Sequence, residues 1–396
     1  MKRLLSIATL YPHAQAPRFG TFVARSLEAL ARTGEWDVTV VNPVGIPPFA
    51  RGSYARRRDV LGSARENGVG VHRVRFPILP GLSGPINPAL IARAILPTVR
   101  RMHQAAPFDL LDAQFFYPDG PAAMRLSAAL GIPFAIKARG ADISYWGTRR
   151  ASLAQMRAAA CKAARLLSVS QALATDMAAL GMPPGKIAVH YTGLDRDLFR
   201  PLDRLECRRR LGEQFGLDFP VRAPLLATVG ALIERKGQAL VIDALGRLDG
   251  AHLLLAGNGP DEARLRAQAA ALGLGERVHF LGSLDHAMLP VLLSASDALV
   301  SPSVSEGLAN AWVEALACGC PLVISDAGGA KELLTTPQAG RIVARDPAAI
   351  ADAVTAILAA PPRRADVAAQ VDQFGWDSHA ARLSEYYSEI LVDAGR

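Results

Sequence analysis

The sequence alternates short apolar runs of strand length with stretches whose apolar residues recur at helical spacing. Apolar runs without alternation predict strands buried on both faces, and helices between them predict parallel sheets. The runs fall into two series, which predict two doubly wound α/β domains. The first series is 4–10, 38–41, 69–74, 110–116, 134–138 and 166–169, and the second is 225–229, 252–256, 278–281, 298–301 and 322–325.

The polar, turn-rich stretch at 191–224 separates the two series. We therefore expect one domain over 1–190 and another over 191–372, with a ligand at the carboxyl ends of the strands. After Pro361-Pro362, residues 373–396 have the pattern of a separate amphipathic helix, which could pack on either domain.

Composition excludes several classes of protein. Apolar residues make up 50% and charged residues 20%, values typical of globular chains rather than disordered or fibrous ones. Four cysteines are too few for a disulfide scaffold, and no ligands complete a zinc site around Cys318 and Cys320, so we expect reduced, cytosolic thiols. The longest clean apolar run, 223–233, is too short to span a membrane. The N-terminus imitates a secretory signal, but Tyr11-Pro12 interrupts it, and we interpret it as a first strand.

Charge divides the chain. Residues 1–190 carry 24 Lys and Arg against 10 Asp and Glu, whereas residues 191–396 carry 20 against 26. The basic half predicts an anionic partner, with lipid, a phosphorylated acceptor and nucleic acid as candidates and an ordinary solvated surface as the alternative. No aromatic-basic motif supports nucleic acid. Stretches 43–65 and 77–101 interrupt the alternation, and either they contact an anionic bilayer or they pack on their own domain.

The segment 301–334 carries the most chemical information. A predicted strand is followed by the turn 306–310 and then by a helix from about Ala311 to Cys318. The N-terminus of a helix binds anions through its free N–H groups and its dipole. Glu306 and Glu314 place a carboxylate on either side of this phosphate site. A nucleotide sugar has hydroxyls on both sides of its diphosphate, so the layout favours that ligand; the alternative is a Glu306 that stabilises the helix and a solvated Glu314.

Further residues at strand ends extend this candidate site. Lys236 and Arg235 open the helix after strand 225–229, where a cation opposes the dipole unless an anion neutralises it. Gly257 begins a Gly-x-Gly turn that lacks the third glycine of a dinucleotide fingerprint, which argues against NAD and for a wall of a nucleotide pocket. In the first half, Gly20 opens a helix where backbone can approach a ligand closely.

The segment 135–147 ends a strand of the first half with charged residues. Lys137, Arg139 and Asp142 follow one another there, and charges at the carboxyl end of a strand face the ligand cleft. The alternative is a salt-bridged loop.

Together these residues resemble retaining glycosyltransferase family 4. Glu306, seven residues, Glu314 and the following ALACGCPLVISDAGG resemble its double-Glu signature, VGALIERKG its donor-phosphate segment, and YTGLDRDLF its interdomain link. SIATLYPHAQAPRFGTFV, FFYPDG and ARGADI are similar to a subgroup, the TuaC-like enzymes of teichuronic-acid-type cell-surface polysaccharide assembly. The resemblance covers essentially the whole chain.

The resemblance implies a GT-B fold, in which two Rossmann-like domains face each other and the last helix crosses back to the first. It implies a retaining glycosyltransferase that moves a sugar from a nucleotide-diphosphate sugar to a saccharide or lipid-linked acceptor, in the cytoplasm or at the cytoplasmic face of the membrane. A nucleotide-sugar epimerase or hydrolase on the same fold, and a non-enzymatic sugar-binding protein, are the alternatives.

The resemblance also implies roles. Glu314 binds the ribose, Glu306 binds donor-sugar hydroxyls, and Lys236 with the 307–310 backbone binds the diphosphate. No metal, cofactor or protein nucleophile is expected, because cations and helix N-termini neutralise the leaving group and a donor phosphate oxygen takes the acceptor proton. Two departures are Ala231, where many members have Arg, and Arg139, where many have His. The expected catalytic set is Glu306, Lys236 and Arg139; the acceptor set is Arg139 and Asp142; and the donor set is Gly20, Gly230, Arg235, Lys236, Gly257, Ser283, Leu284, Glu306, Gly307, Leu308, Ala309, Asn310 and Glu314.

Overall fold

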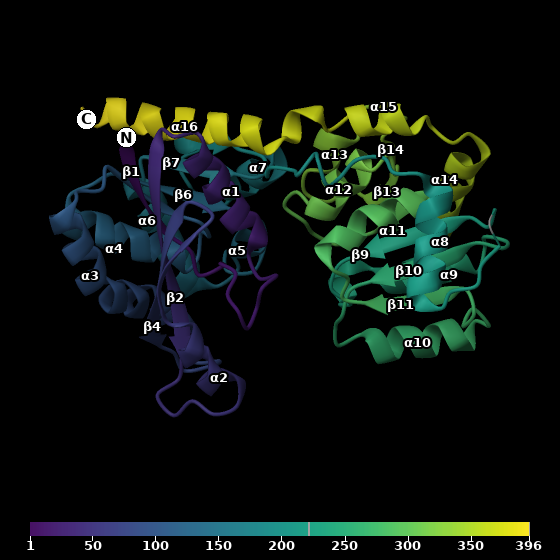
Figure 1. Cartoon of the computed structure of the whole chain (residues 1–396), viewed down its shortest axis with the longest axis horizontal. Coiled ribbons are helices and arrows are strands. Elements are labelled where there is room, and N and C mark those ends of the chain that lie inside the picture. The colour runs from purple at the N-terminus through teal and green to yellow at the C-terminus, as the bar shows by residue number, and fades with distance from the viewer. Residues whose placement is uncertain (221, 396) are drawn as a thin grey trace. The chain divides into compact units, whose positions relative to one another are not determined.

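The computed structural model describes residues 1–220 and 222–395, which form two compact units (Figure 1). The N-terminal unit contains residues 1–193 and the C-terminal helix that begins at Trp376, and the C-terminal unit is Leu194–Gly375. The sequence placed these divisions at 190/191 and 372/373. The expected α/β class with two Rossmann-like domains is confirmed.

The N-terminal unit is an eight-stranded sheet with the order β3-β4-β2-β1-β5-β6-β7-β8. All neighbouring pairs are parallel except the β3–β4 hairpin. Strands β2 to β4 are added on one side of β1 and strands β5 to β8 on the other, so the strand order changes side between β1 and β5. Its elements are β1 (Lys2–Ile7), α1 (Thr21–Arg32), β2 (Trp36–Ile46), α2 (Ser53–Arg56), η1 (Arg57–Val60), β3 (Gly62–Glu66), β4 (Val69–Pro77), η2 (Gly84–Ile86), α3 (Asn87–Ala105), β5 (Leu110–Ala113), α4 (Asp119–Leu130), β6 (Phe134–Ala138), α5 (Ala141–Ser144), α6 (Arg150–Lys162), β7 (Arg165–Ser168), α7 (Gln171–Ala179), η3 (Pro184–Lys186), β8 (Ile187–Val189) and α16 (Trp376–Asp393).

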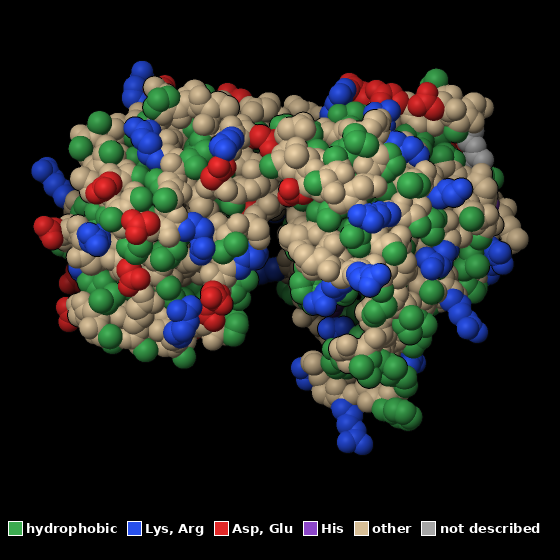
Figure 2. All heavy atoms as spheres, turned by 180° about the vertical axis from the view of Figure 1, so that it is seen from behind, with side chains coloured by type: hydrophobic (Ala, Val, Ile, Leu, Met, Phe, Trp, Pro, Cys, Tyr) green, Lys and Arg blue, Asp and Glu red, His purple; other side chains and the backbone are tan. Residues whose placement is uncertain are grey.

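The two stretches that interrupt the sequence pattern are built on the N-terminal unit. β2 continues to Ile46, a short lobe with α2 follows, and β3 pairs with β4 through a turn in which Asn67 and Gly68 have positive φ. An Asn-Gly pair is the strongest short hairpin signal in a sequence, and it would have located this hairpin. The second stretch is mostly α3, a helix of 19 residues that contains Pro97. On the face seen in Figure 2, Lys and Arg side chains gather over this unit and its lobe.

The C-terminal helix α16 packs on the N-terminal unit as expected. Leu383, Tyr387 and Ile390 belong to the same buried cluster as Leu27 and Val38. The end of the chain therefore supplies a helix that completes the core of the first unit.

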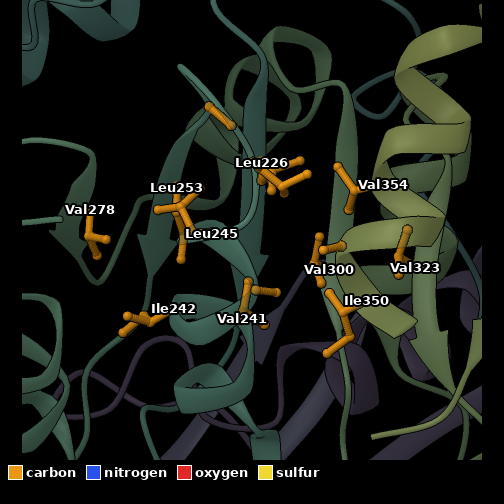
Figure 3. Close-up of a cluster of buried hydrophobic side chains, with 14 of the residues drawn as sticks. Leu226, Val241, Ile242, Leu245, Leu253, Val278, Val300, Val323, Ile350 and Val354 are labelled. Atoms are coloured by element: carbon orange, nitrogen blue, oxygen red, sulfur yellow. The ribbon is translucent and has the colours of Figure 1, made fainter. Parts of the chain in front are cut away.

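The C-terminal unit is a parallel six-stranded sheet with the order β11-β10-β9-β12-β13-β14. Its aliphatic core lies between the sheet and the helices α9, α10 and α14 (Figure 3). Its elements are α8 (Arg204–Phe215), β9 (Leu225–Val229), η4 (Glu234–Lys236), α9 (Gln238–Leu245), β10 (His252–Ala256), α10 (Glu262–Ala271), β11 (Val278–Gly282), η5 (His286–Met288), α11 (Leu289–Ala295), β12 (Ala298–Ser301), α12 (Asn310–Ala317), β13 (Leu322–Ser325), α13 (Ala330–Leu333), β14 (Gly340–Val343), α14 (Pro347–Ala359), α15 (Arg364–Ala369) and η6 (Asp372–Phe374).

Across residues 1–220 and 222–395, no helix is both long enough and apolar enough to cross a bilayer. All four cysteines are free thiols.

Candidate functional site

The candidate donor site lies at the carboxyl edge of the C-terminal sheet. The order reverses between β9 and β12, because β10 and β11 extend the sheet on one side and β13 and β14 on the other. Loops diverge at such a switch point and leave a crevice, which is where open α/β sheets bind ligands. Lys236 follows β9 and Glu306 follows β12, so the two residues flank this point.

The structure brings three of the predicted charged residues together. The Nζ of Lys236 lies 2.5 Å from Oε1 of Glu306, and a guanidinium nitrogen of Arg235 lies 3.7 Å from the other carboxylate oxygen. Only 9% of the Glu306 side chain and 17% of the Lys236 side chain are exposed, whereas Arg235 is 41% exposed. Glu306 is therefore shared by two cations in a partly desolvated place, where charges interact more strongly than in bulk water.

Sequence reasoning expected Lys236 to await an anion and did not foresee this ion pair. The signal was available, because both residues follow neighbouring strands of one sheet. Without a ligand, Glu306 neutralises Lys236; a bound diphosphate would give that ammonium group a second acceptor.

Backbone contacts fix the two charged loops against each other and their neighbours. The amide of Val304 donates to the carbonyl of Arg235 over 2.8 Å, and the amide of Gly329 donates to the carbonyl of Gly307 over 2.8 Å. A Cβ on Gly257 would lie 1.9 Å from the carbonyl oxygen of Gly230, so this glycine lets the loops after β9 and β10 touch. What the structure shows for this turn is contact between the two loops; its role as a wall of a nucleotide pocket stays a prediction.

The helix after Glu306 begins without a side-chain cap. α12 starts at Asn310, its N-cap is Ala309, and no side chain accepts a hydrogen bond from its first turn. Backbone N–H groups there are open to an acceptor from outside the helix, which is the property that binds phosphate. Glu314 lies in the second turn of α12 and is half-buried.

The remaining donor-set residues of this unit lie in the same group of loops. Gly230 directly follows β9, and Leu308 is buried in the loop before α12. Ser283 and Leu284 follow β11 at the edge of the sheet, and Gly257 donates its amide to the carbonyl of Gly282 over 2.8 Å.

Four predicted residues belong to the N-terminal unit. Lys137, which was expected to face the ligand cleft, is instead buried, with 2% of it exposed. Gly20 caps α1 with φ 74°, and a Cβ there would lie 2.5 Å from the carbonyl carbon of Leu10. Its close approach is thus to the chain's own backbone. The carboxylate of Asp142 accepts the amides of Phe116, Arg139 and Gly140, so it orders the loops after β5 and β6.

Arg139 is also engaged within its own unit. Its guanidinium donates to the carbonyl and the side chain of Gln114 at 2.7 and 2.6 Å, and it lies over the ring of Phe22. Burial is the main cause that lowers the pKa of Arg139 to about 10, and Asp142 opposes this shift.

Sequence reasoning missed a buried polar network in the same unit. Lys137 Nζ lies 2.6 Å from Nδ1 of His190, whose Nε2 donates to the carbonyl of His379. His379 in turn contacts the carbonyl of Tyr191 and the hydroxyl of Ser26. One nitrogen of each ring donates to a carbonyl oxygen, and the other lies beside a group that can donate to it, the Lys137 amine or the Ser26 hydroxyl. This arrangement fits neutral imidazoles. Burial lowers the pKa of both histidines well below the usual value.

Two further buried carboxyl groups lie in the same unit. The hydroxyl of Tyr387 on α16 donates to Asp112. Asp119 accepts the amide of Thr9 over 3.1 Å, and burial raises its pKa to about 7. The network of Lys137, His190 and His379 joins the sheet to α16, and no sequence motif predicted it. Among the described residues, no group of three or more His, Cys, Asp or Glu side chains has a geometry that could hold a metal ion.

Comparison with known families matches both units. Residues 19–193 match the family described as a glycosyl transferase 4-like domain, and residues 212–373 match glycosyl transferases group 1. The putative teichuronic acid biosynthesis glycosyltransferase TuaC of Bacillus subtilis is 27% identical over 361 residues, 89% of this chain and 88% of that protein. D-inositol 3-phosphate glycosyltransferase 2 of Catenulispora acidiphila is 31% identical over 248 residues, 58% of this chain. That match spans 57% of the inositol enzyme's length.

Solved structures share the fold over nearly the whole chain. Sucrose-phosphate synthase from Thermosynechococcus elongatus superposes with a TM-score of 0.80 at 20% identity, covering 99% of this chain and 100% of that one. HepE from Anabaena, solved with UDP-glucose, gives a TM-score of 0.75 at 20% identity, covering 98% of this chain and 100% of that one. Taken with the two family matches, this protein belongs to the GT-B glycosyltransferases of the GT4 type, in which a glycosyl transferase 4-like domain precedes a group 1 domain.

Proposed function

We propose that this protein transfers a sugar, with retention of configuration, from a nucleotide-diphosphate sugar to a saccharide or lipid-linked acceptor in cell-surface glycan synthesis. The observation that carries the proposal is the Lys236–Glu306 pair at the switch point of a parallel sheet, beside the uncapped N-terminus of α12. This combination offers cations and amides to a diphosphate and a carboxylate to hydroxyl groups.

In this proposal the diphosphate of the donor is bound between the residues that contact its sugar and those that contact its ribose. Lys236, Arg235 and the amides at the start of α12 neutralise the charge that grows on the leaving diphosphate, which is the largest electrostatic demand of the reaction. Glu306 accepts hydrogen bonds from the donor sugar, and Glu314 accepts them from the ribose. A donor phosphate oxygen takes the acceptor proton, so no protein nucleophile and no metal is needed.

The relatives support the donor and acceptor classes. HepE was solved with UDP-glucose, which favours a uridine diphosphate sugar as donor. The TuaC relative is described as a teichuronic acid glycosyltransferase, which favours a cell-surface glycan as product.

The test is release of nucleoside diphosphate from a panel of UDP-, GDP- and ADP-sugars, with and without saccharide acceptors. We expect acceptor-dependent release that is unchanged by a chelator and falls about 100-fold in Glu306→Gln, because an interaction with the transition state is lost. The matched control is Glu262→Gln, a surface residue paired with Arg266 on α10. Release that ignores Glu306 would refute the proposal, and equal release without acceptor would favour a hydrolase.

We also propose that the N-terminal unit contacts an anionic membrane surface from the cytoplasmic side. Phe49 is 94% and Leu82 79% exposed, and the exposed Arg51 follows two residues after Phe49 in the same lobe. Apolar insertion and attraction to anionic lipid, at about 1 kcal/mol per basic residue, would act together.

A vesicle sedimentation assay checks this contact. Binding should require phosphatidylglycerol, weaken as salt is added, and drop in Phe49→Ser/Leu82→Ser. Leu205→Ser, at a 62% exposed position of the C-terminal unit, should bind normally. Binding that ignores lipid charge would contradict the proposal.

A further inference from the structure

A second pocket, outside the donor site, opens on the N-terminal sheet. It has a volume of about 670 Å³ and lies over the carboxyl ends of β1, β2 and β4, beside the point where the strand order reverses between β1 and β5. Its walls come from the 13–19 segment, the end of β2, the lobe with α2, and the start of α3. Such a place in an open α/β sheet is a ligand site by topology.

The charged side chains that line this pocket are all basic. Arg56 and Arg57 line it, and none of its lining residues is Asp or Glu. Arg57 donates one N–H to the carbonyl of Gly45 over 3.1 Å and lies over the ring of Tyr54, so its guanidinium is held in place with donors to spare. Within the described residues neither arginine forms an ion pair. A pocket with the held guanidinium of Arg57 and the exposed one of Arg56, and with no acidic side chain to neutralise them, attracts an anion. Arginine binds carboxylate and phosphate through paired donors.

Three polar side chains that line the pocket keep a buried atom without a hydrogen-bond partner among the described residues. These atoms are Nδ1 of His13, Oδ1 of Asn42 and Oδ1 of Asn87. The orientation of Asn42 is fixed, because its Nδ2 donates to the carbonyl of Ala8 over 2.6 Å. Buried polar atoms are nearly always satisfied in native proteins. A polyhydroxylated ligand, with small side-chain adjustments, supplies the missing partners.

The pocket also has an apolar side. Phe19, which is 49% exposed, Phe76 and Ile78 line it together with the polar groups. Aromatic and aliphatic surface beside hydrogen-bonding groups suits a sugar ring, which has a C–H face and a rim of hydroxyls. Arginines, amides and an aromatic ring in one pocket thus select a ligand that is both a saccharide and an anion.

We infer that this pocket binds the acceptor, and that the acceptor is a saccharide with an anionic group, a carboxylate or a phosphate, held by Arg56 and Arg57. The inference rests on the proposed function, because it assigns the second substrate of the same reaction. The sugar ring lies against Phe19, and its hydroxyls bind Asn42 and Asn87.

The experiment measures binding of four probes to the full chain by calorimetry. The probes are methyl β-D-glucuronide, D-glucose 6-phosphate, methyl β-D-glucoside and inorganic phosphate. The variant is Arg56→Gln/Arg57→Gln. The matched control is Arg51→Gln/Arg58→Gln, which removes two exposed arginines that do not line the pocket but belong to the same lobe. Melting temperatures and UDP binding are recorded for each protein.

At least one anionic sugar should bind ten times or more tighter than the neutral glucoside, and the Arg56/Arg57 variant should lose that advantage while the control keeps it. Glucuronide binding identifies a uronate, and glucose 6-phosphate binding identifies a phosphorylated saccharide. Equal binding of the neutral glucoside, unchanged binding in the variant, inorganic phosphate as tight as glucose 6-phosphate, or no binding of any probe overturns the inference. UDP binding separates the two claims, because failure of this pocket leaves it intact whereas failure of the proposed function removes it from every protein.

Discussion

The two units share one architecture but fill their interiors differently. In the C-terminal unit the core beneath the donor loops is aliphatic (Figure 3), and the Lys236–Glu306 pair lies at the carboxyl edge of the sheet. The N-terminal unit buries more charged groups: every buried Asp and Lys among the described residues belongs to it, namely Asp112, Asp119, Lys137 and Asp142. Arg208, paired with Asp297, is the buried charged residue of the described C-terminal unit.

This difference shows two ways to stabilise a site at the end of a sheet. The C-terminal unit packs an apolar core and lets short loops carry the chemistry. The N-terminal unit uses a buried hydrogen-bond network to order its loops and needs α16 to cover part of it, through the Tyr387 to Asp112 hydrogen bond. Buried polar networks are costly when one member is lost, so the N-terminal unit should be the more sensitive one.

The largest effect is expected at the contact of α16. Tyr387 is 1% exposed and packs edge-on against Trp36, with ring centroids 5.7 Å apart. Tyr387→Ala should destabilise the N-terminal unit by about 3–5 kcal/mol, the usual loss for a buried aromatic side chain. Hydrogen exchange resolved by residue should show faster opening in the N-terminal unit and an unchanged rate of opening in the C-terminal unit.

Val392→Ala on the same helix is the control, because Val392 is 74% exposed. It should change stability by less than about 0.5 kcal/mol. An equal increase in the opening rate of both units in Tyr387→Ala would contradict the claim that the N-terminal unit is the more sensitive one.

Strands buried on both faces were predicted from the sequence, and exposed ones were not. The predicted strands 225–229, 252–256, 298–301 and 322–325 coincide with β9, β10, β12 and β13, because runs that are mostly apolar without alternation define a strand buried on both faces. β3 was missed because its residues are mostly exposed, and α3 because Pro88 and Pro97 hide its helical spacing. β14, with one exposed and two half-buried residues of four, was missed as well.

A smaller effect should follow from Gly257→Ala in the C-terminal unit. The new Cβ would collide with the carbonyl of Gly230 and separate the loops after β9 and β10. Gly250→Ala is the matched control, since Gly250 also has positive φ but a Cβ there would meet no atom within 4 Å. Gly257→Ala should cost about 1–3 kcal/mol more by thermal unfolding and weaken UDP binding. Equal cost in both variants would show that φ alone explains the glycine.

The smallest predicted effect is a difference in pH dependence. Below pH 6.5 the unfolded chain protonates His190 and His379, whereas the folded unit, in which their pKa values are lowered, does not. The contribution of the two histidines to the free energy of unfolding is therefore fully present above pH 6.5. Each histidine loses about 1.4 kcal/mol of it for every pH unit below that value. Asp119, with a pKa raised to about 7, acts in the opposite direction and offsets about one histidine. Burial also raises the pKa of Asp112 and of Asp142, which act like Asp119, and lowers the pKa of Lys137, which acts like the histidines.

Hydrogen exchange of the N-terminal unit at pH 7.5 and 5.5 checks this balance. We expect the ratio of the opening rates at pH 5.5 and 7.5 to be lower in His379→Gln than in the parent, because one group that favours opening at low pH is removed. A variant that keeps the full dependence would show that other groups titrate.

The candidate site was predictable where neighbouring strands carry it and not where separate segments meet. Lys236 and Glu306 were placed together because both follow adjacent parallel strands. The three polar residues His13, Asn42 and Asn87 of the N-terminal pocket come from three separate segments, and no spacing in the sequence joins them. Asp142 and Arg139 were predicted from their place at a strand end, but sequence could not show that backbone amides and Gln114 occupy their side chains.

The central claim is that the C-terminal unit holds a diphosphate through Lys236 beside Glu306. Calorimetric titration of UDP into the full chain, Lys236→Met and the exposed control Arg247→Gln tests it most directly. The account predicts that Lys236→Met weakens UDP binding about tenfold or more, as loss of a charge-assisted contact requires, while Arg247→Gln binds like the parent. Equal UDP affinity in all three proteins would contradict it.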